Sequence, residues 1–329
     1  MHSLTYKSTL TASFIGYIVQ AIVNNFVPLL FLTLQREFSI PLSEITLLVT
    51  INFGVQLLTD LVSARIGERM NYRIAMVTAH GMAALGLILL CFLPGFLPIP
   101  FFGILLSVVI YAVGGGLLEV LVSPIVEACP TENKEAAMSM LHSFYCWGHV
   151  GVVLLSALFF RFFGIANWRI MALLWAIVPI INGILFLRVP IASLIEEGEQ
   201  EERMGSLLRS GIFWLLFLMM ICAGASEQAV SQWASTFAEQ ALGVSKTIGD
   251  LFGPMAFAVC MGTSRAIYGK FGDTLDLNKF MLTSAILCIA SYLMISLVPV
   301  PAVGLIGTAL CGFSVGIMWP GTFSKAAAI

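Results

Sequence analysis

The chain has 329 residues, of which 59% are hydrophobic and only 10% are charged. Because a soluble domain usually carries about a quarter charged residues, this composition predicts an integral membrane protein. The formal net charge is -2, and no cluster of Lys and Arg forms a basic patch. Nucleic acid is therefore excluded as an expected partner, and the lipid bilayer is expected to surround the chain.

Ten apolar segments are long enough to cross the hydrocarbon core as helices, which needs about 20 residues each. In chain order they cover residues 8–34, 42–64, 74–93, 99–126, 136–163, 168–187, 211–237, 248–268, 280–298 and 302 to the end. The first lacks a small-residue cleavage site and is interpreted as a span and not as a signal peptide. The sequence thus predicts an all-α, multi-pass membrane protein.

The basic residues of the loops are distributed unevenly between the two sides of the membrane. If the N-terminus is cytoplasmic, that side holds Lys7, Arg65, Arg69, Arg73, Lys134, Arg188, Arg203, Arg209, Arg265, Lys270 and Lys279. The opposite side holds only Arg36, Arg161, Arg169 and Lys246. Since cytoplasmic loops carry the excess of Lys and Arg, we expect a cytoplasmic N-terminus in the cell membrane.

One long polar loop divides the spans into a group of six and a group of four. It contains five glutamates in quick succession, at positions 196, 197, 199, 201 and 202. We interpret residues 191–209 as a cytoplasmic acidic linker between an N-terminal six-helix bundle, 1–190, and a C-terminal bundle, 210–329. A solvated connector and a regulatory or partner-binding segment both remain possible for such a charge run.

Two loops at equivalent places, six spans apart, resemble each other. The chain reads DLVSARIGERMNYR from Asp60 and GKFGDTLDLNK from Gly269. Both are similar to the loop signature of the major facilitator superfamily, in which a Gly is followed by an acid and by basic residues around a second Gly. The positions that match are Arg65, Gly67 and Arg69 in the first loop and Gly269 and Asp273 in the second. Asp60 and Ala64 depart from the pattern, and Lys279 alone remains of the second basic cluster.

Within that superfamily the chain is most similar to the fucose-permease-like sugar porters. The segments that carry this resemblance are GGGLLEVLVSPIVEA, from Gly114, and WPGTFSKA, from Trp319. The first span shares a pair of asparagines but has Pro28 where an acidic residue is expected. The resemblance implies a monomeric secondary transporter that moves a sugar by alternating access with a proton as coupling ion. It also implies twelve spans, so we expect this sequence to be a fragment or a truncated form.

Glu119 is the first ionisable residue that we single out, because charged groups inside a span are costly and usually functional. It follows three consecutive glycines in the fourth span. A carboxyl group in such a place can bind and release a proton near neutral pH. It is a candidate for binding the coupling proton or a substrate hydroxyl, and the alternative is a structural interhelical hydrogen bond.

Glu227 is the second, and it lies in a polar part of the seventh span. Residues four apart share a helix face, so Glu227 with Ser231, and Gln228 with Gln232, form two adjoining polar stripes beside Trp233. A carboxylate, amides and an indole suit a sugar, which offers hydroxyls to polar groups and C–H faces to a ring. We predict that Glu227 also takes part in proton coupling. Polar contacts between helices are the alternative.

The first span carries Gln20, Asn24 and Pro28 at steps of four, with Asn25 alongside. We predict that the three amides bind substrate and that Pro28 bends the helix. For Asn25, a hydrogen bond between helices is the alternative interpretation, with nearly the same weight.

Other polar residues in the spans receive different roles. We assign gating or structural roles to Asp60 with Arg65 or Arg69, and to the matching loop residues Gly67, Gly269 and Asp273. His142, in the fifth span one heptad before His149, is a candidate proton relay or a neutral packing residue.

No catalytic residue, metal site or cofactor is expected. The sequence shows no HExxH, GxSxG or nucleotide-binding loop, and its seven cysteines are far apart without CxxC spacing, which predicts small buried apolar side chains. An exporter of drugs or metabolites is the alternative within the same superfamily. A membrane-embedded enzyme or receptor is the alternative from another class.

Overall fold

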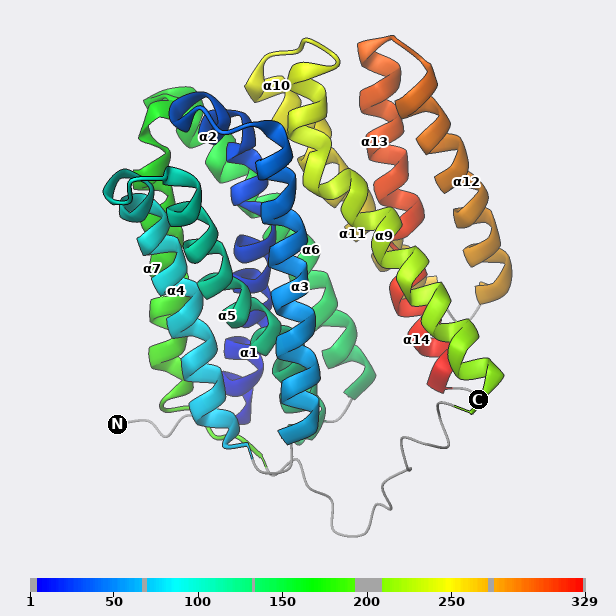
Figure 1. Cartoon of the computed structure of the whole chain (residues 1–329). Helices are drawn as coiled ribbons and strands as arrows, with labels where there is room; N and C mark the ends of the chain where they lie inside the picture. Colours follow the sequence, from blue (N-terminus) through cyan, green and yellow to red (C-terminus); the bar gives the residue numbers. More distant parts are fainter. Residues whose placement is uncertain (1–4, 67–69, 132–133, 193–208, 272–274, 328–329) are drawn as a thin grey trace. The chain divides into compact units, whose positions relative to one another are not determined.

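The computed structural model describes residues 5–66, 70–131, 134–192, 209–271 and 275–327. Every regular element in these ranges is a helix. The chain divides into two compact units, Met1–Ile195 and Glu196–Ile329, and each is described by itself (Figure 1). Most of the predicted acidic linker, 193–208, lies outside the described residues.

The first unit contains six membrane-length helical segments. Their elements are α1 (Tyr6–Asn25), η1 (Val27–Leu30), α2 (Phe31–Phe38), α3 (Leu42–Ile66), α4 (Tyr72–Phe96), α5 (Pro100–Ala128), α6 (Lys134–Phe163), η3 (Ile165–Asn167) and α7 (Trp168–Phe186). The first segment is interrupted where we expected a bend. Pro28 lies at the start of the 3₁₀ turn η1 between α1 and α2, because proline cannot donate the hydrogen bond that would continue the α-helix.

The second unit contains the remaining four predicted spans. Its elements are α9 (Gly211–Gln240), α10 (Lys246–Asp250), η4 (Leu251–Met255), α11 (Ala256–Phe271), α12 (Leu277–Leu297), α13 (Pro301–Val315) and α14 (Met318–Ala327). The eighth span is not one regular helix: Pro254 lies in the π-helical turn η4, between α10 and α11. By length and composition, nine helical segments within the described ranges could cross a membrane. They correspond to nine of the ten predicted spans, and the broken eighth span is the one that is missing from them.

Helix α5 packs closely against three other helices through three consecutive glycines. A Cβ atom at Gly114 would lie 2.5 Å from the carbonyl oxygen of Ala79 on α4. At Gly115 it would meet Gln20 and Val23 on α1, and at Gly116 it would meet Thr59 on α3. The glycine run therefore gives α5 a different close neighbour at each successive position.

We expect Gly114→Ala to destabilise the protein by about 1–3 kcal/mol, because α4 and α5 must separate to admit a methyl group. The control is Gly151→Ala on α6, where an added Cβ has nothing within 4 Å. It should be neutral or stabilising by up to about 1 kcal/mol. Thermal unfolding of both variants in the same detergent measures the difference. Equal melting temperatures would show that the close approach at Gly114 is not a constraint.

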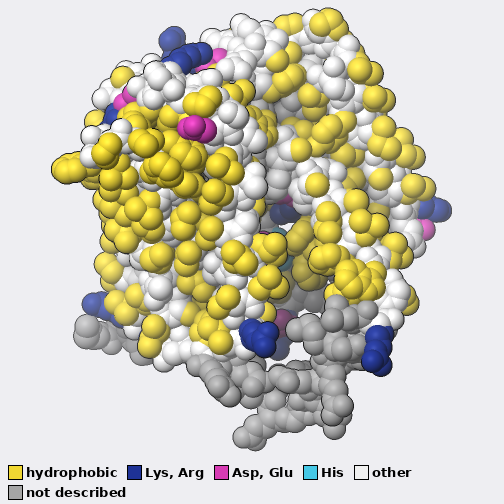
Figure 2. All heavy atoms as spheres, in the orientation of Figure 1, with side chains coloured by type: hydrophobic (Ala, Val, Ile, Leu, Met, Phe, Trp, Pro, Cys, Tyr) yellow, Lys and Arg dark blue, Asp and Glu magenta, His cyan; other side chains and the backbone are white. Residues whose placement is uncertain are grey.

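Large apolar side chains cover the outside of the helices. Phe96, Phe162 and Leu297 are 85%, 77% and 71% exposed, and Figure 2 shows hydrophobic side chains spread over the visible faces, with most charged side chains near the helix ends. Exposed apolar surface of this extent is stable in lipid and not in water.

Polar contacts fix both ends of the first unit. At one end, Arg169 pairs with Glu37 at 2.6 Å, and the Trp168 indole N–H donates to the same carboxylate at 2.7 Å. At the other end, Arg73 donates to the carbonyl oxygen of Phe186 at 2.9 Å. Arg73 and Arg169 thus lie at opposite ends of the unit. This agrees with the predicted loops, which place the two residues on opposite sides of the membrane. The side of the membrane on which each end lies remains a prediction.

Candidate functional site

A chain of hydrogen-bonded polar side chains crosses three helices of the first unit. Nε2 of Gln20 on α1 donates to Oε2 of Glu119 on α5, at 3.3 Å, and to Oε1 of Gln56 on α3, also at 3.3 Å. Nε2 of Gln56 donates in turn to Oδ1 of Asn24, at 2.8 Å. The step of four between Gln20 and Asn24 places both amides on the face of α1 that meets Gln56. We call these four residues the amide chain.

The amide chain runs from an exposed carboxyl group into the interior of the unit. Glu119 is exposed, whereas Gln20, Asn24 and Gln56 are between 2% and 5% exposed. Each hydrogen bond matters in this setting, because a buried amide without partners is costly. Gln56 received no role from the sequence. Its steps of four to Asn52 and to Asp60 place the three side chains on one face of α3, but nothing in the sequence paired Gln56 with Gln20.

Asn25 and His142 make contacts on α1 and between α1 and α6. Nδ2 of Asn25 donates to the carbonyl oxygen of Ala21 in its own helix, at 3.0 Å. The His142 ring lies 5.6 Å from the ring of Tyr17, whose hydroxyl group is 2.8 Å from that of Ser123.

The predicted gating residues are only partly described. Asp60 lies one turn after Gln56 on α3, and its buried Oδ1 has no hydrogen-bond partner among the described residues. Arg65, in the last turn of α3, is exposed, as is Gly269 near the end of α11. The structure records no ion pair between Asp60 and Arg65 in the ranges that it describes. Gly67, Arg69 and Asp273 lie outside those ranges.

Glu227 of the second unit forms a buried ion pair. Its Oε2 lies 3.6 Å from Nη2 of Arg265 on α11, and the two side chains are 11% and 13% exposed. Nε of Arg265 also donates to the carbonyl oxygen of Gly316, at 3.1 Å, which ties the pair to the C-terminal end of α13. The sequence analysis counted Arg265 among the loop charges. That assignment was wrong, because Arg265 lies inside α11 and pairs with Glu227.

The amides that follow Glu227 on α9 contact each other. Nε2 of Gln232 donates to Oε1 of Gln228 at 3.3 Å, and Gln232 is buried while Gln228 and Trp233 are partly exposed. Carboxylate, guanidinium and amides therefore occur together in this unit.

A second buried charge cluster in this unit was missed from the sequence. Asp250 is fully buried, and its carboxylate lies 2.9 Å from Nζ of Lys246 and accepts a hydrogen bond from the Ser235 hydroxyl at 2.5 Å. The cluster joins α9 to α10, directly before the π-helical turn. Its spacing, Lys then Asp four residues later, was visible, but the sequence suggested an exposed loop lysine.

Two buried residues of the first unit form a further polar junction. Nδ1 of His80 is 2.7 Å from the carbonyl oxygen of Met76, and Nε2 is 2.8 Å from Nδ2 of Asn182, which also donates to the carbonyl oxygen of Ala12. Because a carbonyl oxygen only accepts, Nδ1 carries the proton and Nε2 accepts, so His80 is neutral. This junction holds α1, α4 and α7 together, and the sequence analysis did not identify it.

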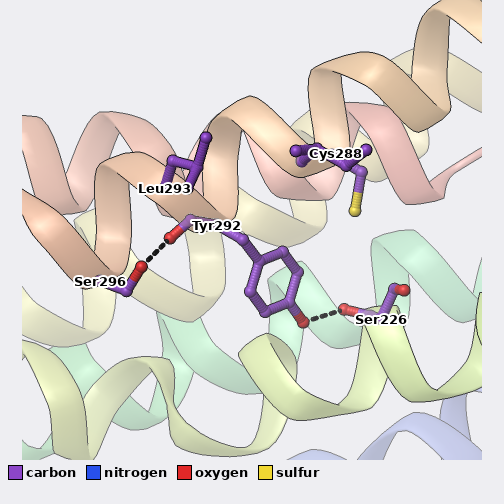
Figure 3. Close-up of a pocket in the computed structure, with 6 residues that line it drawn as sticks. Ser226, Cys288, Tyr292, Leu293 and Ser296 are labelled. Carbon is purple, nitrogen blue, oxygen red and sulfur yellow. Dashed lines mark hydrogen bonds between the residues drawn. The ribbon is translucent and has the colours of Figure 1, made fainter.

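A pocket of about 390 Å³ opens between α9 and α12 of the second unit. Figure 3 shows Tyr292 reaching across it to donate to the carbonyl oxygen of Ser226, at 2.8 Å, with Cys288 one turn away. Ser226 precedes Glu227 on α9, and consecutive helical residues point about 100° apart, so the pocket and the Glu227 ion pair lie on different faces. All seven cysteines are free; five are buried as expected, but Cys222 is exposed.

These arrangements can bind protons and hydroxyl-bearing solutes. The amide chain offers donors and acceptors next to a carboxyl group, and the second unit offers a carboxylate, a guanidinium and two amides. No cluster of three or more metal-ligating side chains occurs among the residues that were described. The polar groups lie inside apolar helices, where such groups usually mark the route of a solute or ion.

Comparison with known proteins identifies the family of the chain. The sequence profile of the Major Facilitator Superfamily matches residues 10–328. A search of the curated protein sequences finds no significant match. Among solved structures, the transporter FucP in its outward conformation is similar to the chain with a TM-score of 0.71 at 15% identity, over 97% of this chain and 84% of FucP.

Two other solved structures are similar to the same extent. The xylose transporter XylE from E. coli, in a partially occluded inward-open conformation, gives a TM-score of 0.71 at 13% identity over 98% of this chain and 87% of XylE. A bacterial homologue of the human lysosomal transporter Spinster gives a TM-score of 0.71 at 14% identity, over 98% of this chain and 75% of that homologue. With the family profile spanning nearly the whole chain, and with helices that match the predicted spans, this protein belongs to the major facilitator superfamily of membrane transporters.

Proposed function

We propose that this protein moves a small polar solute, a sugar, across the membrane by alternating access, with a proton as the coupling ion. The observation that carries the proposal is the hydrogen bond from Gln20 to Glu119, at 3.3 Å, which joins a carboxyl group inside a span to buried amides. A carboxyl group that exchanges a proton next to sugar-binding amides can link the two ligands. Two of the similar structures, the E. coli fucose:proton symporter FucP and the xylose transporter XylE, transport sugars.

In this proposal the polar residues divide into two sets. Solute binding is assigned to Gln20, Asn24 and Asn25 in the first unit and to Gln228, Gln232 and Trp233 in the second. Proton coupling is assigned to Glu119 and Glu227, both of which also contact the solute, with His142 as a further candidate. The six-helix and four-helix groups form the N-terminal and C-terminal bundles, joined by the acidic linker, and the protein acts as a monomer.

Uptake into proteoliposomes tests the proposal. The purified chain is reconstituted, and accumulation of a panel of radiolabelled hexoses, pentoses and deoxy sugars is measured with a proton gradient of either direction and without one. We expect one sugar to accumulate only when the gradient is present. The matched control is the same liposomes with a protonophore, which removes the gradient and leaves the protein unchanged.

Failure of every sugar to accumulate under either gradient would contradict the proposal. The alternative, an exporter of drugs or other metabolites, then predicts gradient-dependent movement of lipophilic cations in the same liposomes.

A further inference from the structure

The direction of every hydrogen bond in the amide chain follows from the charge on Glu119. An ionised carboxylate has no proton and can only accept. Gln20 must therefore turn its NH₂ group toward Glu119, and the second N–H of the same group reaches Oε1 of Gln56. Because Oε1 of Gln56 accepts from Gln20, the NH₂ group of Gln56 faces Asn24 and donates to its Oδ1 atom. One charge at one end thus orients three amides.

Gln20 has an unused acceptor beside this chain. Its Oε1 atom is buried and has no hydrogen-bond partner among the described residues. An amide oxygen in this situation is costly in the interior of a protein. It is also the acceptor that a protonated carboxyl group would need, because a neutral carboxyl group carries an O–H donor.

The chain has room to rearrange on the side of α5. Gly115 has no side chain there, and a Cβ atom at this position would lie 3.1 Å from Oε1 of Gln20 and 3.4 Å from Nε2 of Gln56. Any other residue would press on the amide oxygen of Gln20 and would touch the amide nitrogen of Gln56. Rotation of a terminal amide by 180° exchanges its oxygen and nitrogen while its other atoms keep their places.

We propose that protonation of Glu119 reverses the amide chain, and that Gln56 is the positioning residue that carries the reversal to Asn24. A proton from the aqueous phase adds to Oε2 of Glu119, and the new O–H donates to Oε1 of Gln20 once that amide has rotated. Two oxygens would then face each other, so Gln56 rotates and donates to Oε1 of Gln20. Asn24 rotates last and donates to Oε1 of Gln56. No covalent bond other than the new O–H forms or breaks.

The reversal gives the proton an effect on solute binding. Asn24 offers its amide group in one orientation when Glu119 is charged and in the opposite orientation when Glu119 is neutral. A solute hydroxyl group beside Asn24 therefore meets a donor in one state and an acceptor in the other. This inference rests on the proposed function, in which Glu119 binds the coupling proton and Asn24 binds solute.

Other titratable groups on the helices around α5 must be separated from this effect. They include Tyr17 on α1, Asp60 on α3, His80 on α4 and His142, Tyr145 and His149 on α6. His80 is engaged by Met76 and Asn182, and Tyr17 by Ser123. A signal that is lost in Glu119→Gln but kept in Asp60→Asn and His149→Gln belongs to Glu119.

Infrared difference spectroscopy between low and high pH measures the reversal without any solute. The purified protein carries ¹³C in the side-chain amides of Gln and Asn, which separates these bands from the backbone. We expect a protonated carboxyl band that is absent in Glu119→Gln. We also expect shifts of the Gln and Asn amide bands with the same midpoint pH, which Gln20→Leu and Asn24→Leu assign to their residues.

Two variants break the reversal in different ways. Gln56→Met keeps the side-chain length but removes the central amide, and Gly115→Ala keeps every amide but restricts rotation. In both, the carboxyl band should still titrate, while the Asn24 amide shift is lost. The control is Asn52→Leu, one turn before Gln56 on the same face, whose buried Oδ1 has no partner in the described ranges. It should keep both signals.

The outcomes separate this inference from the proposed function. If no carboxyl band depends on Glu119, the proton site is wrong and the reversal is wrong with it. If the carboxyl band titrates but the amide bands do not move, or if Asn24 still responds in Gln56→Met, the reversal alone is overturned. If Gly115→Ala does not fold, Gln56→Met still decides the question.

Discussion

Glu119→Gln should reduce gradient-driven accumulation of the transported sugar by about 5- to 150-fold, the range spanned by typical coupling free energies of 1–3 kcal/mol. Glutamine keeps the size of the side chain and can still hydrogen-bond Gln20, but it cannot exchange a proton. Exchange of labelled for unlabelled sugar needs no net proton movement, so it should fall much less. Uptake and counterflow in the same proteoliposomes measure the two effects.

The matched control for this prediction lies on the same helix. Glu127 is an exposed carboxyl group in the last turn of α5, and Glu127→Gln makes the same chemical change two turns away. It should leave accumulation and its pH dependence unchanged. Transport by Glu119→Gln with an unaltered pH dependence would refute the coupling role of Glu119.

Arg265→Ala should lower the free energy of unfolding by about 3–5 kcal/mol, because it leaves the buried carboxylate of Glu227 without its partner. The substitution also removes the hydrogen bond to the carbonyl oxygen of Gly316, at 3.1 Å, at the C-terminal end of α13. Thermal or denaturant unfolding of the detergent-solubilised protein measures the change.

A double variant tests the mechanism of this loss. Arg265→Met with Glu227→Met removes both charges and should recover much of the stability, since an apolar pair replaces a buried ion pair at little cost. Lys270→Ala, an exposed position on the same helix, is the control and should change stability by no more than about 0.5 kcal/mol. An Arg265→Ala protein as stable as the Lys270→Ala protein would show that the ion pair contributes nothing.

The helices were predictable because hydropathy decides which segments can lie in a bilayer. Each of the ten predicted spans corresponds to helical structure, since the backbone in lipid must satisfy its hydrogen bonds within the segment. The exception in detail is the eighth span. There the regular helix is interrupted by the π-helical turn that contains Pro254, between α10 and α11. A hydropathy average over about 20 residues does not detect such a local interruption.

The partners of the polar residues were not predictable in the same way. Helical periodicity placed Gln20 and Asn24 on one face, but the contact with Gln56 depends on how α1 and α3 approach α5 through Gly115. Arg265 was misassigned because a cation near the end of a span looks like a loop charge until its partner is seen. Asp250 was overlooked because it lies close to a predicted loop. Its burial depends on how α9 packs against α10, which the sequence does not show.

Proton movement on addition of sugar shows whether Glu119 couples the two ligands. Liposomes that contain the protein and a trapped pH-sensitive dye are mixed with each sugar of the panel, with no imposed gradient. We expect a transported sugar added outside to carry protons inward and acidify the lumen, and Glu119→Gln to remove this signal. Entry of a sugar with no change in internal pH, or an equal acidification by Glu119→Gln, would contradict this expectation.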